Sequence, residues 1–173
     1  MHKTSARVEK GFSLIELLIV VVIIGIIAAI AIPNLLASRR SANEASAVSS
    51  VRVIFGAQAT YRATSGNGYY ADNLNQLSTS GIVDTLLGCP ADPCVKSGYT
   101  FMIDQDPGSP STYPPNWNAL VSPTSSSGAM QSGSLSFYTN EIGAIYYKMG
   151  GTPPVAGLSS TVRTPTDGTA LGN

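Results

Sequence analysis

The chain has 173 residues and a formal net charge of zero, and only 12% of its residues are charged. This length holds one modest domain plus a segment outside its core, and nothing demands two globular domains. Without its first eleven residues the chain keeps seven basic and nine acidic residues, so it has no electrostatic reason to bind nucleic acid.

The N-terminus combines a basic start with a long apolar stretch. Lys3, Arg7 and Lys10 lie in the first ten residues, whereas residues 17 to 38 carry no charge. Such an asymmetry indicates a membrane topology signal. Every residue from Leu17 to Ile32 is Leu, Ile, Val, Ala or Gly, and the run extends back to Phe12 with only Ser13 and Glu16 interrupting it.

This apolar stretch is long enough to cross a bilayer. At about 1.5 Å per residue its length corresponds to about 30 Å of helix, which matches the hydrocarbon core of a membrane. A cleaved secretory signal peptide is the alternative, with Ala29-Ile30-Ala31 as its cleavage site. The length of the apolar run and the acidic Glu16 within it both argue against that alternative.

The start of the stretch carries a specific motif. The residues Lys10-Gly11-Phe12-Ser13-Leu14-Ile15-Glu16-Leu17, followed by the apolar run and Pro33, resemble the class III signal of type IV prepilins. The resemblance implies that a prepilin peptidase removes a leader, residues 1–11, by cutting between Gly11 and Phe12, and that the new amine of Phe12 is methylated. The apolar helix is then retained.

The same resemblance implies where the chain works. It implies a single-pass stage in the bacterial inner membrane with the N-terminus in the cytoplasm, contact with a pilus assembly platform there, and then a homo-oligomeric helical filament outside the cell. It also implies the pilin fold, in which one long N-terminal helix packs on an antiparallel sheet.

Glu16 needs a cationic partner. A carboxylate in a membrane helix costs on the order of 3 kcal/mol unless it is paired, and no Lys or Arg lies between Gly11 and Arg39. Cleavage before Phe12 creates an ammonium group one helical turn away, on the same chain and on a neighbouring subunit. We therefore expect an ion pair between Glu16 and the Phe12 amine of another subunit. The alternative is that Glu16 merely reaches the membrane surface.

The helix is expected to continue well beyond the apolar stretch. Pro33 predicts a kink near Ala29, with Gly25 as a second weak point. Apolar residues then recur at helical spacing, and they predict a hydrophobic half, 12–34, and an amphipathic half, 35–65, of one helix from Phe12 to about Ser65.

The rest of the chain predicts an α+β domain, 66–149. An irregular segment with a short helical turn at Asp72–Leu77 precedes four runs of strand character. These runs predict a roughly four-stranded antiparallel sheet that covers an apolar helix face. The strands are Tyr99–Ile103, Trp117–Val121, Leu135–Thr139 and Ala144–Lys148, with a hairpin at Asn140–Gly143, and the helix face comprises Val48, Val51, Ile54 and Phe55.

Three segments rich in Ser, Thr, Gly and Pro are expected to be exposed. They are the loops Pro107–Pro115 and Ser122–Ser134 and a C-terminal tail, 150–173, which either is poorly ordered or covers a neighbour. Their hydroxyl groups could accept O-linked sugars, on composition alone.

Cys89 and Cys94 enclose the sequence Pro-Ala-Asp-Pro. In a chain that crosses a membrane, this spacing favours a small disulfide loop over free thiols. Zinc is the other alternative, but a structural zinc site usually takes four protein ligands and His2 is the only histidine.

Enzyme chemistry has little support in this sequence. The processed chain would contain no histidine, which excludes Ser-His and Cys-His nucleophiles. Asp104 and Asp106 could act as an acid and a base, but we expect them to be solvated on the surface. They are also a weak candidate for calcium, without the glycine and glutamate of an EF-hand loop. No other metal site and no cofactor is predicted.

We therefore expect a structural subunit of an extracellular type IV pilus, which serves adhesion, aggregation or twitching motility. The mature length of about 162 residues, the exposed polar loops and the missing calcium motif favour this function. The alternative is a pseudopilin of a type II secretion system or a minor pilin for DNA uptake. A binding module secreted by a cleaved signal peptide is a third class.

Overall fold

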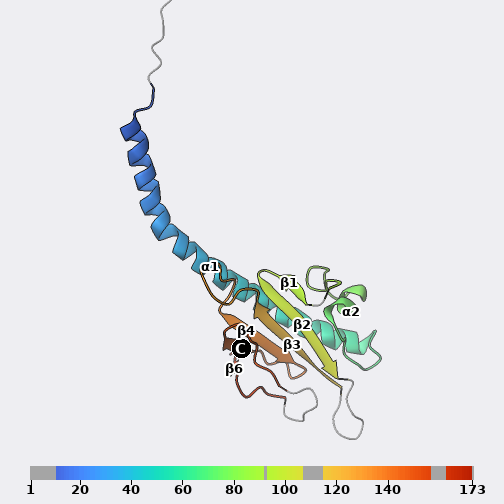
Figure 1. Cartoon of the computed structure of the whole chain (residues 1–173). Coiled ribbons are helices and arrows are strands. Elements are labelled where there is room, and N and C mark those ends of the chain that lie inside the picture. Colours follow the sequence, from blue (N-terminus) through green and yellow to red (C-terminus); the bar gives the residue numbers. More distant parts are fainter. Residues whose placement is uncertain (1–10, 92, 107–114, 157–162, 173) are drawn as a thin grey trace, which may run out of the picture. The chain divides into compact units, whose positions relative to one another are not determined.

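The computed structural model describes residues 11–91, 93–106, 115–156 and 163–172. The chain forms two compact units, one ending at Ala37 and the other beginning at Ser38. Figure 1 shows one long helix, α1, Leu14–Ala63, followed by a short helix and a sheet. The first part of α1 belongs to the first unit, and the rest of the chain forms the second.

Helix α1 has nearly the bounds that the sequence predicts. It begins and ends within two residues of Phe12 and Ser65 and continues through Pro33. The side-chain amide of Asn34 donates a hydrogen bond to the carbonyl of Ile30, 3.1 Å away, one turn earlier. The kink expected at Pro33 stays a prediction.

The second unit contains a six-stranded antiparallel sheet whose strands follow one another in chain order. Each strand therefore pairs with its neighbours in the sequence, as a meander. The strands are β1 (Cys94–Lys96), β2 (Tyr99–Asp106), β3 (Asn116–Pro123), β4 (Leu135–Asn140), β5 (Tyr146–Met149) and β6 (Thr169–Ala170).

The sheet confirms the α+β prediction and extends it. The four predicted strands are present as β2 to β5, although β5 begins at Tyr146 rather than at Ala144. The two outer strands, β1 and β6, were not predicted, because runs of three and two residues carry no alternation that a sequence pattern can detect. The prediction of about four strands was therefore too low.

The second half of α1 packs on one face of this sheet. Ala47, Val51 and Ile54 of α1 are fully buried, as Val51 and Ile54 were predicted to be. Alternate strand residues complete the core because successive side chains in a strand point to opposite faces. The strand residues in this core are Cys94, Tyr99, Phe101, Ile103, Trp117, Ala119, Val121 and Phe137.

Phe55 corrects one detail of the predicted helix face. Its side chain remains 37% exposed at the rim of the core, where its ring lies 6.4 Å from that of Trp117. Buried Gln58 takes a place in the core instead. Its amide exchanges two hydrogen bonds with the backbone of Ala71, of 2.8 and 3.0 Å, so its polar atoms are satisfied.

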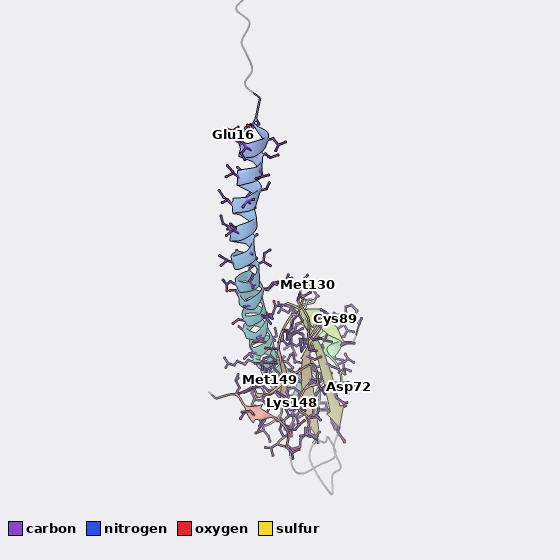
Figure 2. The ribbon with its side chains drawn as sticks, turned by 60° about the vertical axis from the view of Figure 1, so that its left-hand side comes forward. Glu16, Asp72, Cys89, Met130, Lys148 and Met149 are labelled. Carbon is purple, nitrogen blue, oxygen red and sulfur yellow. A yellow bond between two sulfur atoms is a disulfide. The ribbon has the colours of Figure 1, made fainter. Side chains whose placement is uncertain are left out.

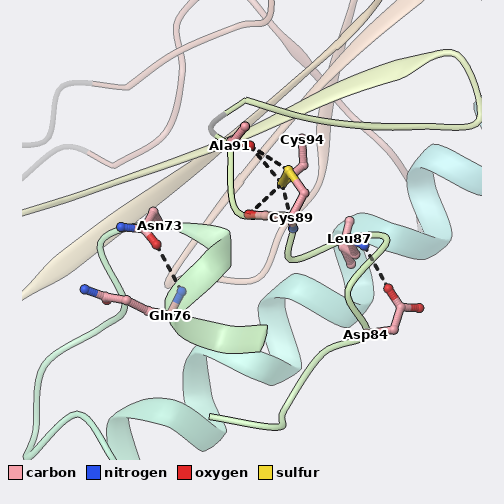
Figure 3. Close-up of a disulfide and its surroundings, with 7 residues drawn as sticks. All are labelled: Asn73, Gln76, Asp84, Leu87, Cys89, Ala91 and Cys94. Atoms are coloured by element: carbon pink, nitrogen blue, oxygen red, sulfur yellow. Dashed lines mark hydrogen bonds between the residues drawn. A yellow bond between two sulfur atoms is a disulfide. The ribbon is translucent and has the colours of Figure 1, made fainter. Parts of the chain in front are cut away.

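A short helix, α2 (Leu74–Thr79), lies between α1 and the sheet in the sequence. It overlaps the turn predicted at Asp72–Leu77, but it begins and ends two residues later. Asn73 caps its N-terminus by accepting a hydrogen bond from the Gln76 N–H, 3.0 Å away (Figure 3). Leu74 and Leu77 of α2 are buried in the same core.

The predicted hairpin between β4 and β5 is present. Its turn closes through a hydrogen bond of 3.0 Å from the Gly143 N–H to the Asn140 carbonyl. Gly143 has a φ of 85°, a conformation that favours glycine. A side chain at this position would also meet the ring of Phe55, 2.8 Å from the added carbon atom.

The segment expected to be a tail takes part in the second unit. Strand β6 pairs with β5, joining Thr169 to Tyr147 and Ala170 to Tyr146. Ala156 and Arg163 are buried as well. The described parts of this segment therefore complete their own sheet. Of the two loops expected to be exposed, Pro107–Pro115 lies mostly outside the described residues.

Candidate functional site

The predicted assembly residues lie at the N-terminal end of α1. Ser13 immediately precedes the helix, and Glu16 is its third residue. One carboxylate oxygen of Glu16 accepts a hydrogen bond of 2.9 Å from the backbone N–H of Ser13. This contact is half of a capping box, in which the third helical residue reaches back to the residue before the helix. Figure 2 shows Glu16 at this end of α1.

The predicted cleavage position is next to this contact. Gly11 and Phe12 precede Ser13, both are exposed, and the Phe12 side chain is 87% exposed. A cut between them would place the new amine on the residue before the N–H that Glu16 already accepts. Residues 1–10 of the predicted leader, 1–11, lie outside the described residues.

The contact with Ser13 was not predicted. A cation was the only partner expected for Glu16, whereas a backbone N–H at the start of a helix also needs a partner. The spacing Ser-Leu-Ile-Glu is a capping-box pattern and could have predicted the contact.

The apolar part of α1 that follows Glu16 has no cover within its own chain. Its most apolar window has a mean hydropathy of 3.2, and none of that window is buried. Among the described residues α1 is the one helix long and apolar enough to cross a membrane. Gly25 lies in this part, and no neighbouring atom lies within 4 Å of where its side chain would begin. A lipid or protein environment is needed to cover this surface.

The disulfide is confirmed. Cys89 and Cys94 are bonded, with their Cα atoms 5.6 Å apart, and no free cysteine remains (Figure 3). Cys94 begins β1 and is 1% exposed, so the bond ties the segment after α2 to the edge of the sheet. The Cys89 N–H also donates to the Cys94 sulfur, 3.0 Å away.

Asp104 and Asp106 lie on β2, two residues apart and therefore on one face of the sheet. Asp104 is exposed and Asp106 is half-buried. Among the described residues, no group of three or more His, Cys, Asp or Glu side chains is arranged to hold a metal ion. The weak calcium prediction at this pair stays untested.

A buried polar cluster, which was not predicted either, lies on the face of the sheet opposite α1. Arg163 donates to both carboxylate oxygens of Glu141, at 2.6 and 3.0 Å, and to Asn118 Oδ1 at 2.7 Å. Asn140 donates to the Arg163 carbonyl at 2.6 Å, and Asn118 donates to the Ala156 carbonyl at 3.0 Å. These bonds fasten the C-terminal segment to β3 and β4.

Burial and neighbouring charge have opposite effects on the pKa of Arg163 in this cluster. Burial lowers the pKa of Arg163, but the hydrogen bond and negative charge of Glu141 outweigh it, so that the pKa rises above its ordinary value. Burial also raises the pKa of Tyr138, whose hydroxyl donates to Asn118 Oδ1 at 2.8 Å. The cluster therefore keeps a charged arginine and a neutral tyrosine at physiological pH.

Comparison with known proteins agrees with this architecture. Residues 6–32 match the family model of the prokaryotic N-terminal methylation motif. The chain is 33% identical over 106 residues to the type II secretion system core protein G of Aeromonas hydrophila, and 29% identical over 104 residues to that of Escherichia coli. It is 42% identical over 79 residues to the type IV wide pilus major component PilA4 of Thermus thermophilus.

These matches cover part of each protein. They span 58%, 57% and 46% of this chain and 68%, 66% and 59% of the Aeromonas, Escherichia and Thermus proteins. No solved structure matches the chain significantly.

A methylation motif, an uncovered apolar helix and a meander sheet packed on the second half of that helix together define a filament-forming class of protein. The chain belongs to the family of type IV pilins and type II secretion pseudopilins. This family implies assembly into a helical filament and processing by a prepilin peptidase.

Proposed function

We propose that this chain is the precursor of a structural subunit of an extracellular type IV pilus. One observation carries the proposal. The first half of α1 presents an apolar surface, with no part of its most apolar window buried, and a single carboxylate, Glu16, at its beginning. A surface of this kind is compatible with lipid before assembly and with the helices of neighbouring subunits afterwards.

The proposed pathway begins in the inner membrane, with the N-terminus in the cytoplasm. A prepilin peptidase cuts between Gly11 and Phe12, and the Phe12 amine is methylated, which preserves its charge. The apolar half of α1, 12–34, stays with the mature subunit and becomes the core of the filament. The amphipathic half, 35–65, carries the globular domain, which lies outside that core.

Glu16 sets the register in this proposal. Similar aliphatic rows fit together at several offsets, so apolar packing alone specifies the register of neighbouring helices poorly. Of the two oxygens of Glu16, one accepts the Ser13 N–H. The other is available for the Phe12 ammonium of an adjoining subunit. Any other offset leaves a charge unpaired in a low-dielectric core.

A pseudopilin of a type II secretion system, or a minor pilin for DNA uptake, is the second candidate. The two secretion relatives favour the first of these because their matches are longer, 104 and 106 residues against 79 for the Thermus pilus component. The higher identity to the pilus component of Thermus thermophilus and the serine-rich loop between β3 and β4, Thr124–Ser134, favour the pilus. Filaments sheared from the cell surface that contain this chain would decide for the pilus.

Substitution of Glu16 tests the assembly mechanism. Glu16→Ala is expected to leave expression, membrane insertion and cleavage at Gly11 largely intact. The number of surface filaments, counted by electron microscopy, should fall about tenfold or more because the register loses its ion pair. Asp104→Ala is the control, and it should assemble normally unless calcium is bound there.

Glu16→Gln separates the charge from the helix cap. The glutamine oxygen can still accept the Ser13 N–H, but it cannot pair with an ammonium. We expect Glu16→Gln to fail in assembly as Glu16→Ala does. Normal filaments with Glu16→Gln alone would show that capping rather than charge is required, and normal filaments with both variants would exclude any role of Glu16 in assembly.

A further inference from the structure

The charge-free part of α1 ends at a pair of arginines. Residues 17 to 38 correspond to about 33 Å of helix, close to the thickness of a hydrocarbon core of about 30 Å. Glu16 lies before this stretch, and Arg39 and Arg40 follow it directly. If the stretch spans a bilayer, Glu16 and the two arginines lie in opposite headgroup layers.

A loop of the second unit is fastened to α1 at these arginines. The loop between β3 and β4 contains Gln131, whose side-chain oxygen accepts a hydrogen bond of 2.8 Å from Arg40. Asn43 donates to the Ser132 carbonyl at 2.8 Å. These bonds hold the loop beside the part of α1 that directly follows Ser38, and both partners belong to the second unit.

Glu44 contributes to the same attachment. One oxygen of its carboxylate accepts two hydrogen bonds of 2.7 Å, from the backbone N–H and the hydroxyl of Ser134. Glu44, the acidic residue nearest to the two arginines in the sequence, therefore bonds to the loop. Arg39 is exposed and makes no hydrogen bond or ion pair with the residues that the structure describes.

Met130 projects from this loop. It precedes Gln131 in the sequence and its side chain is 77% exposed (Figure 2). The loop is otherwise made of small and polar residues, so Met130 is its one large apolar side chain. An apolar side chain beside two cations suits the boundary between headgroups and acyl chains, where each group finds its preferred surroundings.

We propose that Arg39, Arg40 and Met130 form a membrane-facing group, here called the collar. The collar binds anionic phospholipids in the leaflet opposite to the one that holds Glu16. The arginines bind the lipid phosphates, which the planar guanidinium group contacts through two hydrogen bonds, and Met130 enters the acyl boundary. The collar fixes the depth of the subunit in the bilayer before assembly. It rests on the membrane stage of the proposed function.

Tryptophan fluorescence tests the collar with the full-length chain in vesicles. Met130→Trp places a probe in the loop, and the single native tryptophan, Trp117, is 1% exposed and supplies a constant background. Vesicles of phosphatidylcholine alone are compared with vesicles of equal parts phosphatidylcholine and phosphatidylglycerol, both with a spin label on the headgroups. Quenching of the probe should be about twofold stronger in the anionic vesicles.

Matched variants locate the effect. Arg39→Gln, added to Met130→Trp, should reduce the quenching in anionic vesicles to the level seen in phosphatidylcholine, and Arg39→Lys should restore most of it. Arg52→Gln removes an exposed arginine several turns further along α1 and should change nothing. Ile142→Trp, in the turn beyond the other end of β4, should not be quenched in either membrane.

Two results would overturn the collar: equal quenching of the Met130 probe in both membranes, or the same loss of quenching from Arg52→Gln as from Arg39→Gln. A separate probe, Ile26→Trp with a spin label deep in the acyl chains, reports insertion itself. If that probe is quenched and the Met130 probe is not, only the collar is wrong. If the Ile26 probe is not quenched, the membrane stage of the proposed function fails, and the collar fails with it.

Discussion

Glu16 has a partner within its own chain before any other subunit arrives. The Ser13 N–H occupies one of its two carboxylate oxygens, and this hydrogen bond offsets part of the cost of holding an acid at the end of an apolar helix. Before assembly, the Glu16 carboxylate therefore already has one hydrogen-bond donor. Assembly has only to offer the second oxygen a cation, which the proposed Phe12 ammonium of a neighbour supplies.

Arg163 joins the C-terminal segment to Glu141 and Asn118 through hydrogen bonds. We expect Arg163→Met to destabilise the second unit by about 3 kcal/mol, because it leaves Glu141 and Asn118 without their shared donor in a buried position. Urea unfolding of the full chain in detergent measures the change. Limited proteolysis should cut the segment after Met149 faster than in the unmodified chain.

A double-mutant cycle supplies the control for this prediction. Glu141→Gln alone should also destabilise the unit, and the combined variant should cost less than the two single changes added together. If the two effects simply add, the ion pair contributes nothing to holding the segment, and the backbone bonds of β6 must do so instead.

At the residue scale, the sequence identified residues that belong to motifs better than it identified side chains that meet only in the folded chain. Gly11, Phe12, Glu16 and the cysteines were recognisable because each belongs to a motif with fixed spacing. Arg163 belongs to none. A single arginine in a segment rich in Ser, Thr, Gly and Pro looks solvated, and only the fold brings it to Glu141, 22 residues earlier in the chain.

The secondary structure elements followed their sequence patterns closely. Helix α1 could be predicted because its apolar residues recur at helical spacing, and β2 to β5 because apolar and aromatic residues concentrate in short runs. The outer strands β1 and β6 could not, since their pairing depends on neighbours rather than on their own residues. The segment 150–173 was taken for a tail for the same reason.

The disulfide acts at this scale, between the segment after α2 and strand β1. Replacing both Cys89 and Cys94 by alanine should destabilise the second unit by about 2 kcal/mol in the chain-entropy model of a loop this small. Hydrogen exchange should show the loss concentrated in β1 and the residues around Leu87, with the centre of the sheet unchanged. An equal loss of protection throughout the sheet would contradict a local role for the bond.

The chain combines one unit whose apolar surface must be covered by lipid or by other chains with one unit that buries its own core. Residues up to Ala37 expose an apolar helix, whereas the unit from Ser38 buries its core between α1 and the sheet. A chain built in this way is soluble neither in water nor in lipid over its full length. The proposed membrane insertion, followed by the proposed assembly into a filament, would meet the needs of both units in turn.

The most direct test of this account is the mass of the mature N-terminus. Peptide mass spectrometry of the subunit in sheared surface filaments should find a chain that begins at Phe12 and carries a methyl group on its amine. A subunit that begins near Ile32 would show an ordinary signal peptide, with the apolar helix discarded. That result would contradict both the proposed filament core and the pairing of Glu16.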